Sequence, residues 1–286
     1  MIHNKTLLLG AVAYDSKVVS IWDGFARYFA KRGLDFDYVL YSNYERQVEA
    51  HFSGHIQVAW NSPLAWLQSE RIAATLGRRA EATCMRDTDR ELTSVIIVRS
   101  DSEIRHLGDL KGKRVAVGAE DSPQATLIPL GHLAAAGLEP NDDFEVVSFD
   151  VRVGKHGDHI GGERDAVRSL VRGEVDAACM MDGNHLLFSQ EGTIPSGTTR
   201  VLAITPAYDH CNFTVLEDAP LELVGRFREL LLGMAYSDAE VRPLLDMEGL
   251  KEWQVGRTSG YAALTTAVDR FGTIDGFVKR VADQCR

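Results

Sequence analysis

The sequence predicts an α/β protein in which two units of alternating strands and helices are followed by a mostly helical C-terminal part. Apolar runs typical of buried strands alternate with amphipathic helix patterns from Leu7 to Glu70, and the alternation restarts at Val115 and continues to Gln190. Strands that alternate with helices form parallel sheets, because parallel neighbours need a long crossover connection. We therefore expect one parallel sheet in each unit.

The first unit is expected to contain three strands and three helices. The apolar run Leu7–Ala13 predicts its first strand, and the helix that follows has a buried stripe that includes Trp22 and Phe25. Ser62 and Pro63 predict the start of the third helix, because Ser is a favoured N-cap and Pro a favoured first helical residue. The other expected elements are the strands Phe36–Tyr41 and Ile56–Trp60 and the helix Tyr44–Ser53.

The second unit contains a strand, Val115–Gly118, that leads into a helix opening at Ser122 and Pro123. Such a helix start has free backbone amides and a partial positive charge, so it is typical of an anion-binding site. We therefore expect either a small-anion site there or an ordinary strand-to-helix turn in which Ser122 caps its own helix. The other expected elements are the strands Glu145–Phe149 and Asp176–Met180 and the helices Ser122–Ala136, Glu163–Arg172 and Gly183–Gln190.

Two further β-rich runs, Leu92–Val98 and Val201–Thr205, are expected to carry the chain between two lobes. Lobe I would then comprise residues 1–93 and 206–286, with the helical C-terminal part packed on it, and lobe II would comprise residues 94–205. Ligands of open α/β sheets bind beyond the carboxyl ends of the parallel strands. The loops at those ends are therefore expected to line a cleft between the lobes.

Charge and cysteine usage exclude several classes of partner. The 286 residues carry a formal net charge of −10, which argues against nucleic acid or an anionic membrane surface as a partner. No run approaches the roughly 20 apolar residues of a membrane span, so we expect no membrane insertion. The four cysteines have no CxxC spacing and favour reduced thiols. We expect a cytoplasmic protein without a signal peptide, or a periplasmic or extracellular one if a signal was removed.

Several stretches carry motifs of a known family. They are the run from Ser94 to Gly118, which contains Asp-Leu-Lys-Gly-Lys-Arg-Val-Ala, the segment 122–129, Gly173-Glu-Val-Asp-Ala-Ala, and Gly54-His-Ile-Gln-Val-Ala-Trp-Asn-Ser-Pro. They resemble the phosphate/phosphite/phosphonate-binding proteins of ABC transporters. The resemblance implies a type II periplasmic-binding-protein fold, with two α/β lobes joined by two crossing strands. It also implies a receptor that closes its lobes on a small solute and has an ABC permease as partner.

The chain departs from the family at the positions that the resemblance assigns to the ligand. Ser122, Pro123, Gln124 and Ala125 stand where the family has Ser-Thr-Ser-Gly, and Leu92 stands where a tyrosine is common. Losing several hydrogen-bond donors, worth about 1.5–3 kcal/mol each to a charged ligand, predicts a changed ligand. We expect a small anionic or zwitterionic molecule, with Asp182 at the position of a family acid that meets an amino group or a hydroxyl.

The expected ligand-binding residues share a place at or after the carboxyl ends of strands. They are Tyr14, Asp15, Asn61, Ser62, Thr93, Ser122, Gln124, Ala125, Thr126, His156, His159, Asp182 and His210. The charged turn 86–90 is expected to be a solvated loop, with closure over the ligand as the alternative.

The loop 154–165 gathers His156, His159 and Glu163 in a short glycine-rich stretch. It is consistent with a solvated loop that offers one histidine to an anion, with a metal site, or with general acid–base catalysis. If a cofactor binds, a divalent transition metal is the candidate, with His156, His159, Glu163 and His210 as ligands.

A second polar stretch, 208–213, contains the neighbours His210 and Cys211. Adjacent residues of an extended segment point to opposite sides, so we expect His210 to face the ligand and Cys211 to be packed inside. If the protein is an enzyme, the catalytic candidates are His156, His159, Glu163 and Cys211, the last as a nucleophile.

Three functions remain open from the sequence. The first is a solute receptor of the family named above. The second is a cytoplasmic enzyme on the same fold that uses the loop 154–165 and His210, either with a metal ion or without one. The third is a receptor whose ligand is a chelated metal ion.

Overall fold

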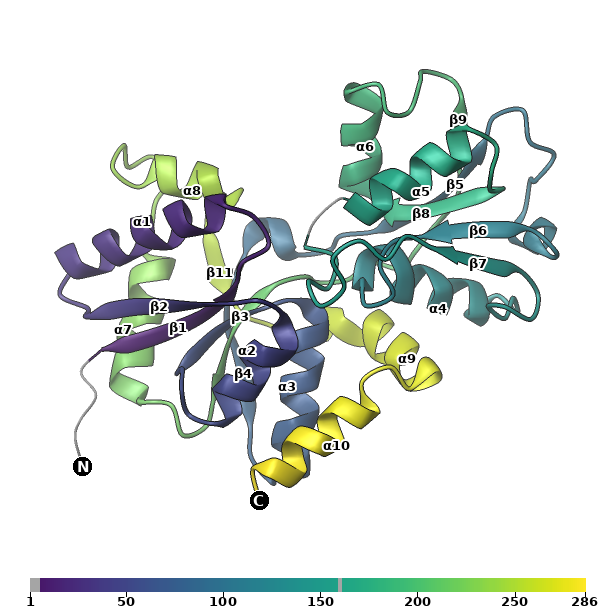
Figure 1. Ribbon diagram of the computed structural model, residues 1–286. Helices are drawn as coiled ribbons and strands as arrows, with labels where there is room; N and C mark the ends of the chain where they lie inside the picture. Colours follow the sequence, from purple (N-terminus) through teal and green to yellow (C-terminus); the bar gives the residue numbers. More distant parts are fainter. Residues whose placement is uncertain (1–5, 159–160) are drawn as a thin grey trace. The chain divides into compact units, whose positions relative to one another are not determined.

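The computed structural model describes residues 6–158 and 161–286, which form two compact units (Figure 1). The first unit comprises Met1–Arg90, Asp209–Ser259 and Ile274–Arg286. The second comprises Glu91–Tyr208 and Gly260–Thr273. Each unit contains one sheet with helices packed against it, which confirms the predicted α/β class.

The first unit contains a six-stranded mixed sheet with the order β11-β4-β10-β3-β1-β2. The expected strands β1, β2 and β3 pair in parallel, but β10 is antiparallel to β3 and β4, and β11 is antiparallel to β4. A purely parallel sheet is therefore a wrong prediction here. Because β10 follows the long excursion through the second unit, no crossover helix constrains its direction. The strands are β1 Leu7–Val12, β2 Phe36–Tyr41, β3 Val58–Asn61, β4 Ala80–Arg86, β10 Asn212–Leu216 and β11 Trp253–Val255.

Helices α1, α7 and α8 cover one face of this sheet, and α2, α3 and α10 cover the other (Figure 1). An aromatic cluster closes the first of these faces: Phe213 lies between Phe227, at a centroid distance of 5.0 Å, and Trp60, at 4.5 Å. Burial of such large rings removes apolar surface from water and so stabilises the unit. The helices are α1 Lys17–Lys31, α2 Tyr44–Phe52, α3 Pro63–Thr75, α7 Leu221–Leu232, α8 Arg242–Glu248 and α10 Asp275–Gln284.

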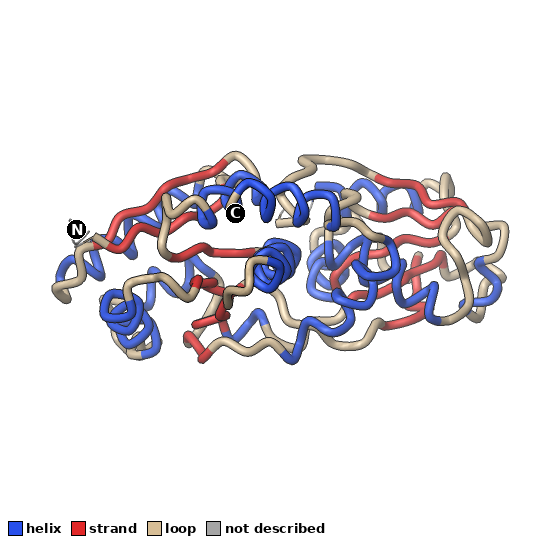
Figure 2. Tube along the Cα trace, turned by 90° about the horizontal axis from the view of Figure 1, so that it is seen from below, coloured by secondary structure: helices blue, strands red, loops and turns tan. Residues whose placement is uncertain are grey.

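The second unit contains a five-stranded sheet with the order β7-β6-β8-β5-β9. The strands β7, β6 and β8 are parallel as expected, whereas β5 and β9, which carry the two β-rich runs, are antiparallel to their neighbours. Figure 2 shows these strands among the helices of the unit. The strands are β5 Ser94–Arg99, β6 Arg114–Val117, β7 Glu145–Ser148, β8 Ala177–Met181 and β9 Thr199–Ile204, and the helices are α4 Ile128–Ala135, α5 Gly161–Val171, α6 Asp182–Gln190 and α9 Ala262–Phe271.

The helix predicted to open at Ser122 begins with a wide π-helical turn, Pro123–Leu127, before α4. Pro129 causes this widening, because it has no N–H to donate and its ring crowds the carbonyl group of Ala125 in α geometry. That carbonyl group instead accepts a 3.3 Å hydrogen bond from the backbone N–H of Gly118. The turn is thus fixed directly to the end of β6.

Helix α9 belongs to the second unit, although we expected the whole helical C-terminal part with the first lobe. Ala267 of α9 packs against Gly131 of α4, where the missing side chain allows the two helices to approach. Phe271 adds to the apolar cluster on the same face of the sheet. Sequence periodicity shows which face of a helix is apolar but not which surface will cover it.

Within residues 6–158 and 161–286, no helix combines the length and the apolar character that a membrane crossing requires.

Gly131→Ala is expected to destabilise the protein, whereas the same change at Gly225 is not. A Cβ atom at Gly131 would lie 2.9 Å from Ala267 Cβ and 3.4 Å from Ala267 Cα, while a Cβ atom at Gly225 of α7 meets nothing within 4 Å. Replacing Gly by Ala in an open helix gains roughly 0.5–1 kcal/mol, and forcing atoms into packed space costs about 1–3 kcal/mol. Urea unfolding of both variants measures the difference. Equal gains in both would contradict the packing of α9 on α4.

Candidate ligand-binding site

The carboxyl end of β6 places Ser122 at the start of the π-helical turn. Ser122 is buried, and its hydroxyl oxygen accepts a 3.2 Å hydrogen bond from the backbone N–H of Ala125, as expected of an N-cap. Thr126 is also buried, and its hydroxyl group donates to the carbonyl oxygen of Ala119 at 2.7 Å. Both hydroxyl groups that were expected to bind the ligand therefore make hydrogen bonds inside the unit.

The segment 154–158 lies against this helix start. The side-chain amide of Gln124 donates to the carbonyl oxygen of Gly157 at 2.7 Å, and the backbone N–H of Gly154 donates to Asp121 Oδ2. Gly157 has a φ of +76° and approaches so closely that a Cβ atom there would overlap the Ser122 hydroxyl group. His156 is fully buried in the same segment, while His159 lies outside the described residues.

Ser94, at the start of β5, connects the helix start to Tyr208. Its hydroxyl group lies 2.6 Å from the carbonyl oxygen of Gln124, to which it donates, and 2.8 Å from the Tyr208 hydroxyl group. Tyr208 is buried, and this burial raises the pKa of its phenol. Sequence reasoning missed both residues. No local pattern could have found them together, because Tyr208 is brought there by an antiparallel bridge to Leu92, a residue far away in the chain.

Asp182 begins α6 directly after β8 and is exposed. Thr93 donates from its hydroxyl group to Asp182 Oδ2 at 2.8 Å, and the backbone N–H of Gly183 donates to Oδ1 at 2.7 Å. Glu163 is buried nearby, and its Oε2 accepts from Met181 N at 3.2 Å and from Asn184 Nδ2 at 2.7 Å. Asp182 thus has an oriented carboxylate that reaches solvent, whereas Glu163 fixes the end of β8.

In the first unit, Asn61 and Ser62 end β3 and begin α3. Asn61 is fully buried, its Oδ1 accepts from Gln47 Nε2 at 2.8 Å, and its Nδ2 donates to Thr214 Oγ1 at 2.9 Å. Ser62 is the N-cap of α3 and accepts from Ala65 N at 3.2 Å. These contacts give both residues a role in holding the sheet to its helix.

Tyr14 and Asp15 follow β1. Asp15 is exposed, and its carboxylate accepts from the backbone N–H of Lys17, so it satisfies a free donor at the start of α1. Tyr14 is half-buried, with the Lys17 ammonium group 5.7 Å from the centre of its ring.

The charged turn 86–90 is not the solvated loop that we expected, because Asp89 is buried in it. The Arg86 guanidinium group holds both oxygens of the Asp89 carboxylate, at 2.5 Å and 2.9 Å, and also reaches Glu248 Oε1 at 3.3 Å. Burial alone would raise the pKa of Asp89, but Arg86 and His210 outweigh it and hold this pKa at about 2. Burial raises the pKa of Glu248 to about 7, against the opposing effect of Arg86.

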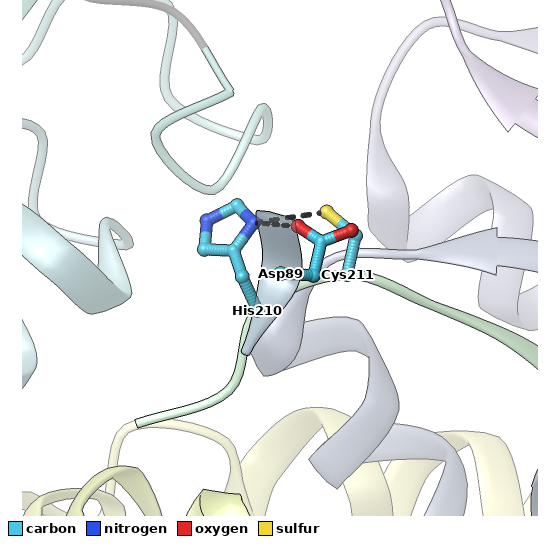
Figure 3. A group of neighbouring side chains, drawn as sticks. All are labelled: Asp89, His210 and Cys211. Atoms are coloured by element: carbon cyan, nitrogen blue, oxygen red, sulfur yellow. Dashed lines mark hydrogen bonds and ion pairs between the residues drawn. The ribbon is translucent and has the colours of Figure 1, made fainter. Parts of the chain in front are cut away.

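His210 and Cys211 lie beside Asp89 (Figure 3). His210 Nδ1 is 3.1 Å from Cys211 Sγ and 3.5 Å from Asp89 Oδ1. The expectation that the two neighbours point to opposite sides is wrong, because residues 209–211 precede β10 and are not extended as a strand. Both contacts also use the same ring nitrogen. A nucleophile–histidine–carboxylate relay needs one nitrogen for each partner, so this geometry does not support Cys211 as an activated nucleophile.

The structure brings some predicted residues together and separates others. Thr93, Ser122, Gln124, Ala125, Thr126, His156 and Asp182 all belong to the second unit. The predicted metal ligands do not form one group within a unit, because His210 belongs to the first unit and His156 and Glu163 to the second. Among the described residues, the group of three or more metal-ligand side chains with converging atoms is Asp89, His210 and Cys211.

Gly157→Ala is expected to move the segment 154–158 away from the helix start. Its matched control is Gly192→Ala, which has a similar φ of +82° but no neighbour within 4 Å of the new Cβ atom. Each change costs about 1–2 kcal/mol of backbone strain. Only Gly157→Ala adds a clash with Ser122 and Gln124, for which we expect a further loss of about 1–3 kcal/mol in urea unfolding. Equal losses would contradict the close contact.

Glu248 is expected to make stability depend on pH. Its pKa in the folded state, about 7, is above the ordinary value of 4.5, so the stabilisation from its protonated form is complete below pH 4.5 and is lost as the pH rises through 7. Relative to Glu248→Gln, the wild type should lose about 2–3 kcal/mol of unfolding free energy between about pH 4 and pH 8. Glu229→Gln, at an exposed ion pair, serves as the control. A pH-independent difference between the wild type and Glu248→Gln would contradict the assignment.

Comparison with known proteins identifies the family. The model of the family described as "ABC transporter, phosphonate, periplasmic substrate-binding protein" matches residues 10–261. Similar solved structures include PhnD1 from Prochlorococcus marinus in complex with methylphosphonate, at 19% identity and a TM-score of 0.69 over 94% of this chain and 99% of that chain. The XAC2383 protein of Xanthomonas citri, bound to chloride ion, has 17% identity and a TM-score of 0.68 over 98% and 99% of the two chains.

A third structure, a binding protein component of an ABC phosphonate transporter from Pseudomonas aeruginosa, has 14% identity and a TM-score of 0.60 over 98% of this chain and 99% of that chain. At these identities the structures show the fold, that of type II periplasmic-binding proteins, while the family model shows the family. The enzyme alternative has no support in these comparisons. The chain therefore belongs to the phosphonate-binding family of periplasmic substrate-binding proteins of ABC transporters, and its function is to bind a solute.

Proposed function

We propose that the solute is a small zwitterionic organophosphonate, in which an anionic group and an amino group are joined by a short carbon chain. The observation that supports this choice is the exposed carboxylate of Asp182 at the edge of the sheet where the helix start at Ser122 also lies. The strands β6 and β8 that lead to these two residues are parallel neighbours. An anion-binding helix end and an oriented carboxylate together match a ligand with both signs of charge.

Contacts within the second unit connect the two recognition elements. Ser94 pairs with Met181 in the sheet, so Thr93 lies beside Asp182, and the Ser94 hydroxyl group donates to the carbonyl oxygen of Gln124 in the helix start. The carboxylate and the helix start are thereby held at one edge of a packed sheet. Binding elements held rigidly in advance cost less entropy when the ligand arrives.

The changed helix start favours a zwitterion over a simple phosphonate. Pro123 has no N–H, and Gln124 directs its side-chain amide to Gly157 rather than to solvent. Fewer donors are then left for the anionic group, and each lost bond to a charged ligand costs about 1.5–3 kcal/mol. An ion pair between an amino group and Asp182 would restore part of that affinity.

Membership of the family implies a partner and a compartment for the protein. Its members are periplasmic substrate-binding proteins of ABC transporters, so an ABC permease is the partner that the family implies. This also favours the periplasm among the compartments considered from the sequence. The divalent metal expected at the loop 154–165 is not needed by this proposal.

Asp182→Asn is expected to discriminate between ligands. The wild type should bind 2-aminoethylphosphonate more tightly than methylphosphonate in isothermal titration calorimetry. The variant should lose roughly 10-fold to 100-fold in affinity for the amino compound, because a hydrogen bond to a charged group is worth about 1.5–3 kcal/mol, and should bind methylphosphonate as before. Asp142→Asn, at an exposed carboxylate before β7, is the control and should change neither affinity.

Other results of the same titrations would overturn the proposal. If neither compound binds to the folded wild type, the organophosphonate class is wrong. If Asp182→Asn weakens both compounds equally, Asp182 does not recognise the amino group.

A further inference from the structure

A buried group of three side chains in the first unit offers donor atoms of the kinds that bind transition metals. Asp89, His210 and Cys211 are all buried, and one potential ligand atom of each lies within 4.8 Å of the other two (Figure 3). We propose that these three residues form a binding site for a divalent transition-metal ion, with Zn²⁺ as the ion that the donor set suits best. The proposal is independent of the proposed solute.

The distances in the group fit one ion. Zn²⁺ binds thiolate sulfur at about 2.3 Å and imidazole nitrogen or carboxylate oxygen at about 2.0–2.2 Å, so two ligand atoms on a tetrahedron are about 3.3–3.8 Å apart. His210 Nδ1 lies 3.5 Å from Asp89 Oδ1 and 3.1 Å from Cys211 Sγ. The third pair, an Asp89 carboxylate oxygen and Cys211 Sγ, lies within 4.8 Å, so one ion could bind all three atoms after side-chain adjustment.

The protein backbone places the ligands in advance. The backbone N–H of His210 donates to the carbonyl oxygen of Asp89 at 2.7 Å, which joins the two segments that carry the site. After Cys211, Asn212 begins β10. Before His210, the Asp209 carboxylate accepts two bonds from Arg257, of 2.6 Å and 2.7 Å. Residues 209–211 are thus fixed at both ends, and their irregular backbone directs two adjacent side chains to the same carboxylate.

A shared cation explains this arrangement better than hydrogen bonds do. Nδ1 of His210 faces both Asp89 Oδ1 and Cys211 Sγ, but a ring nitrogen carries at most one proton, so at most one of the two contacts can be a well-aligned hydrogen bond donated by His210. A metal ion among the three atoms would interact with all of them at once. Its binding converts the Cys211 thiol to a thiolate and releases that proton to water.

Arg86 and its partners form the surroundings that such a site needs. Arg86 holds both oxygens of the Asp89 carboxylate, and metal-binding carboxylates are ordinarily oriented by hydrogen bonds of this kind. The positive charge of Arg86 opposes a second cation, but the Asp89 carboxylate and the Cys211 thiolate counter it. Three protein ligands leave one tetrahedral position for a water molecule.

Cobalt(II) titration of the full chain tests the proposal. The protein is treated with a chelator and then titrated with Co²⁺ and, separately, with Zn²⁺. We expect one ion per chain and, for Co²⁺, the near-ultraviolet charge-transfer absorption that a thiolate ligand produces. Cys211→Ser should abolish that absorption, and Asp89→Asn should weaken binding at least 10-fold. Cys285→Ser, at the partly exposed cysteine at the end of α10, is the matched control and should leave both unchanged.

Far-ultraviolet circular dichroism establishes that each variant is folded. X-ray absorption of the zinc-loaded wild type should show one sulfur among nitrogen or oxygen ligands, and this measurement needs no variant. A folded wild type that takes up no stoichiometric ion overturns the proposal. So does a cobalt spectrum that survives Cys211→Ser and disappears with Cys285→Ser.

Discussion

The buried ion pair between Arg86 and Asp89 holds together the part of the first unit that contains Glu248, His210 and Cys211. Arg86 ends β4, and it binds the turn that follows, reaches Glu248 of α8 and lies over the ring of Trp60. Leaving one partner of such a pair buried alone costs about 3–5 kcal/mol, so these segments are constrained to stay together. The backbone bond from His210 to Asp89 then positions the residues before β10. An arginine and a carboxylate three residues apart thus determine where a histidine and a cysteine from a distant part of the chain are placed.

Buried polar side chains need hydrogen-bond partners inside the protein, and this need distinguishes structural residues from residues that are available to a ligand. Asn61 was an attractive ligand residue by its place after a strand, yet its side chain is fully buried and bonded to Gln47, Ser69 and Thr214. Burial of an amide without partners would cost several times the roughly 1 kcal/mol that each bond contributes. Asp182 follows a strand in the same way, but its carboxylate accepts two hydrogen bonds from Thr93 and Gly183 and still reaches solvent. Position at the end of a strand therefore does not by itself distinguish a binding residue from a structural one.

Local patterns in the sequence predict most elements of both units, and the failures have physical causes. The apolar periodicity predicts β1 to β3, α1 and the helix after Ser122, because each depends on its own residues. The strand β4 was missed, since Ala80–Arg86 mixes charged and apolar residues and is held by its neighbours β10 and β11. The packing of α9 on α4 depends on Gly131 meeting Ala267, a contact between residues far apart in the chain. The two predicted lobe boundaries near residues 93 and 206 stay a prediction.

Family membership and ligand identity depend on different parts of the second unit. The sheet and the helix start at Ser122 follow from features that the chain shares with its family, including the strand Arg114–Val117 and the Ser N-cap. In the segment 154–158, Gly157 packs on Ser122 and accepts the bond from Gln124, a residue that stands where the resemblance places a hydroxyl. A glutamine at this position has an internal partner only if a backbone carbonyl comes within reach, and only a residue without a Cβ atom can approach so closely. The Gln124 amide and the glycine at position 157 thus depend on each other, and a ligand at this helix start would be recognised only by the donors that this pair leaves available.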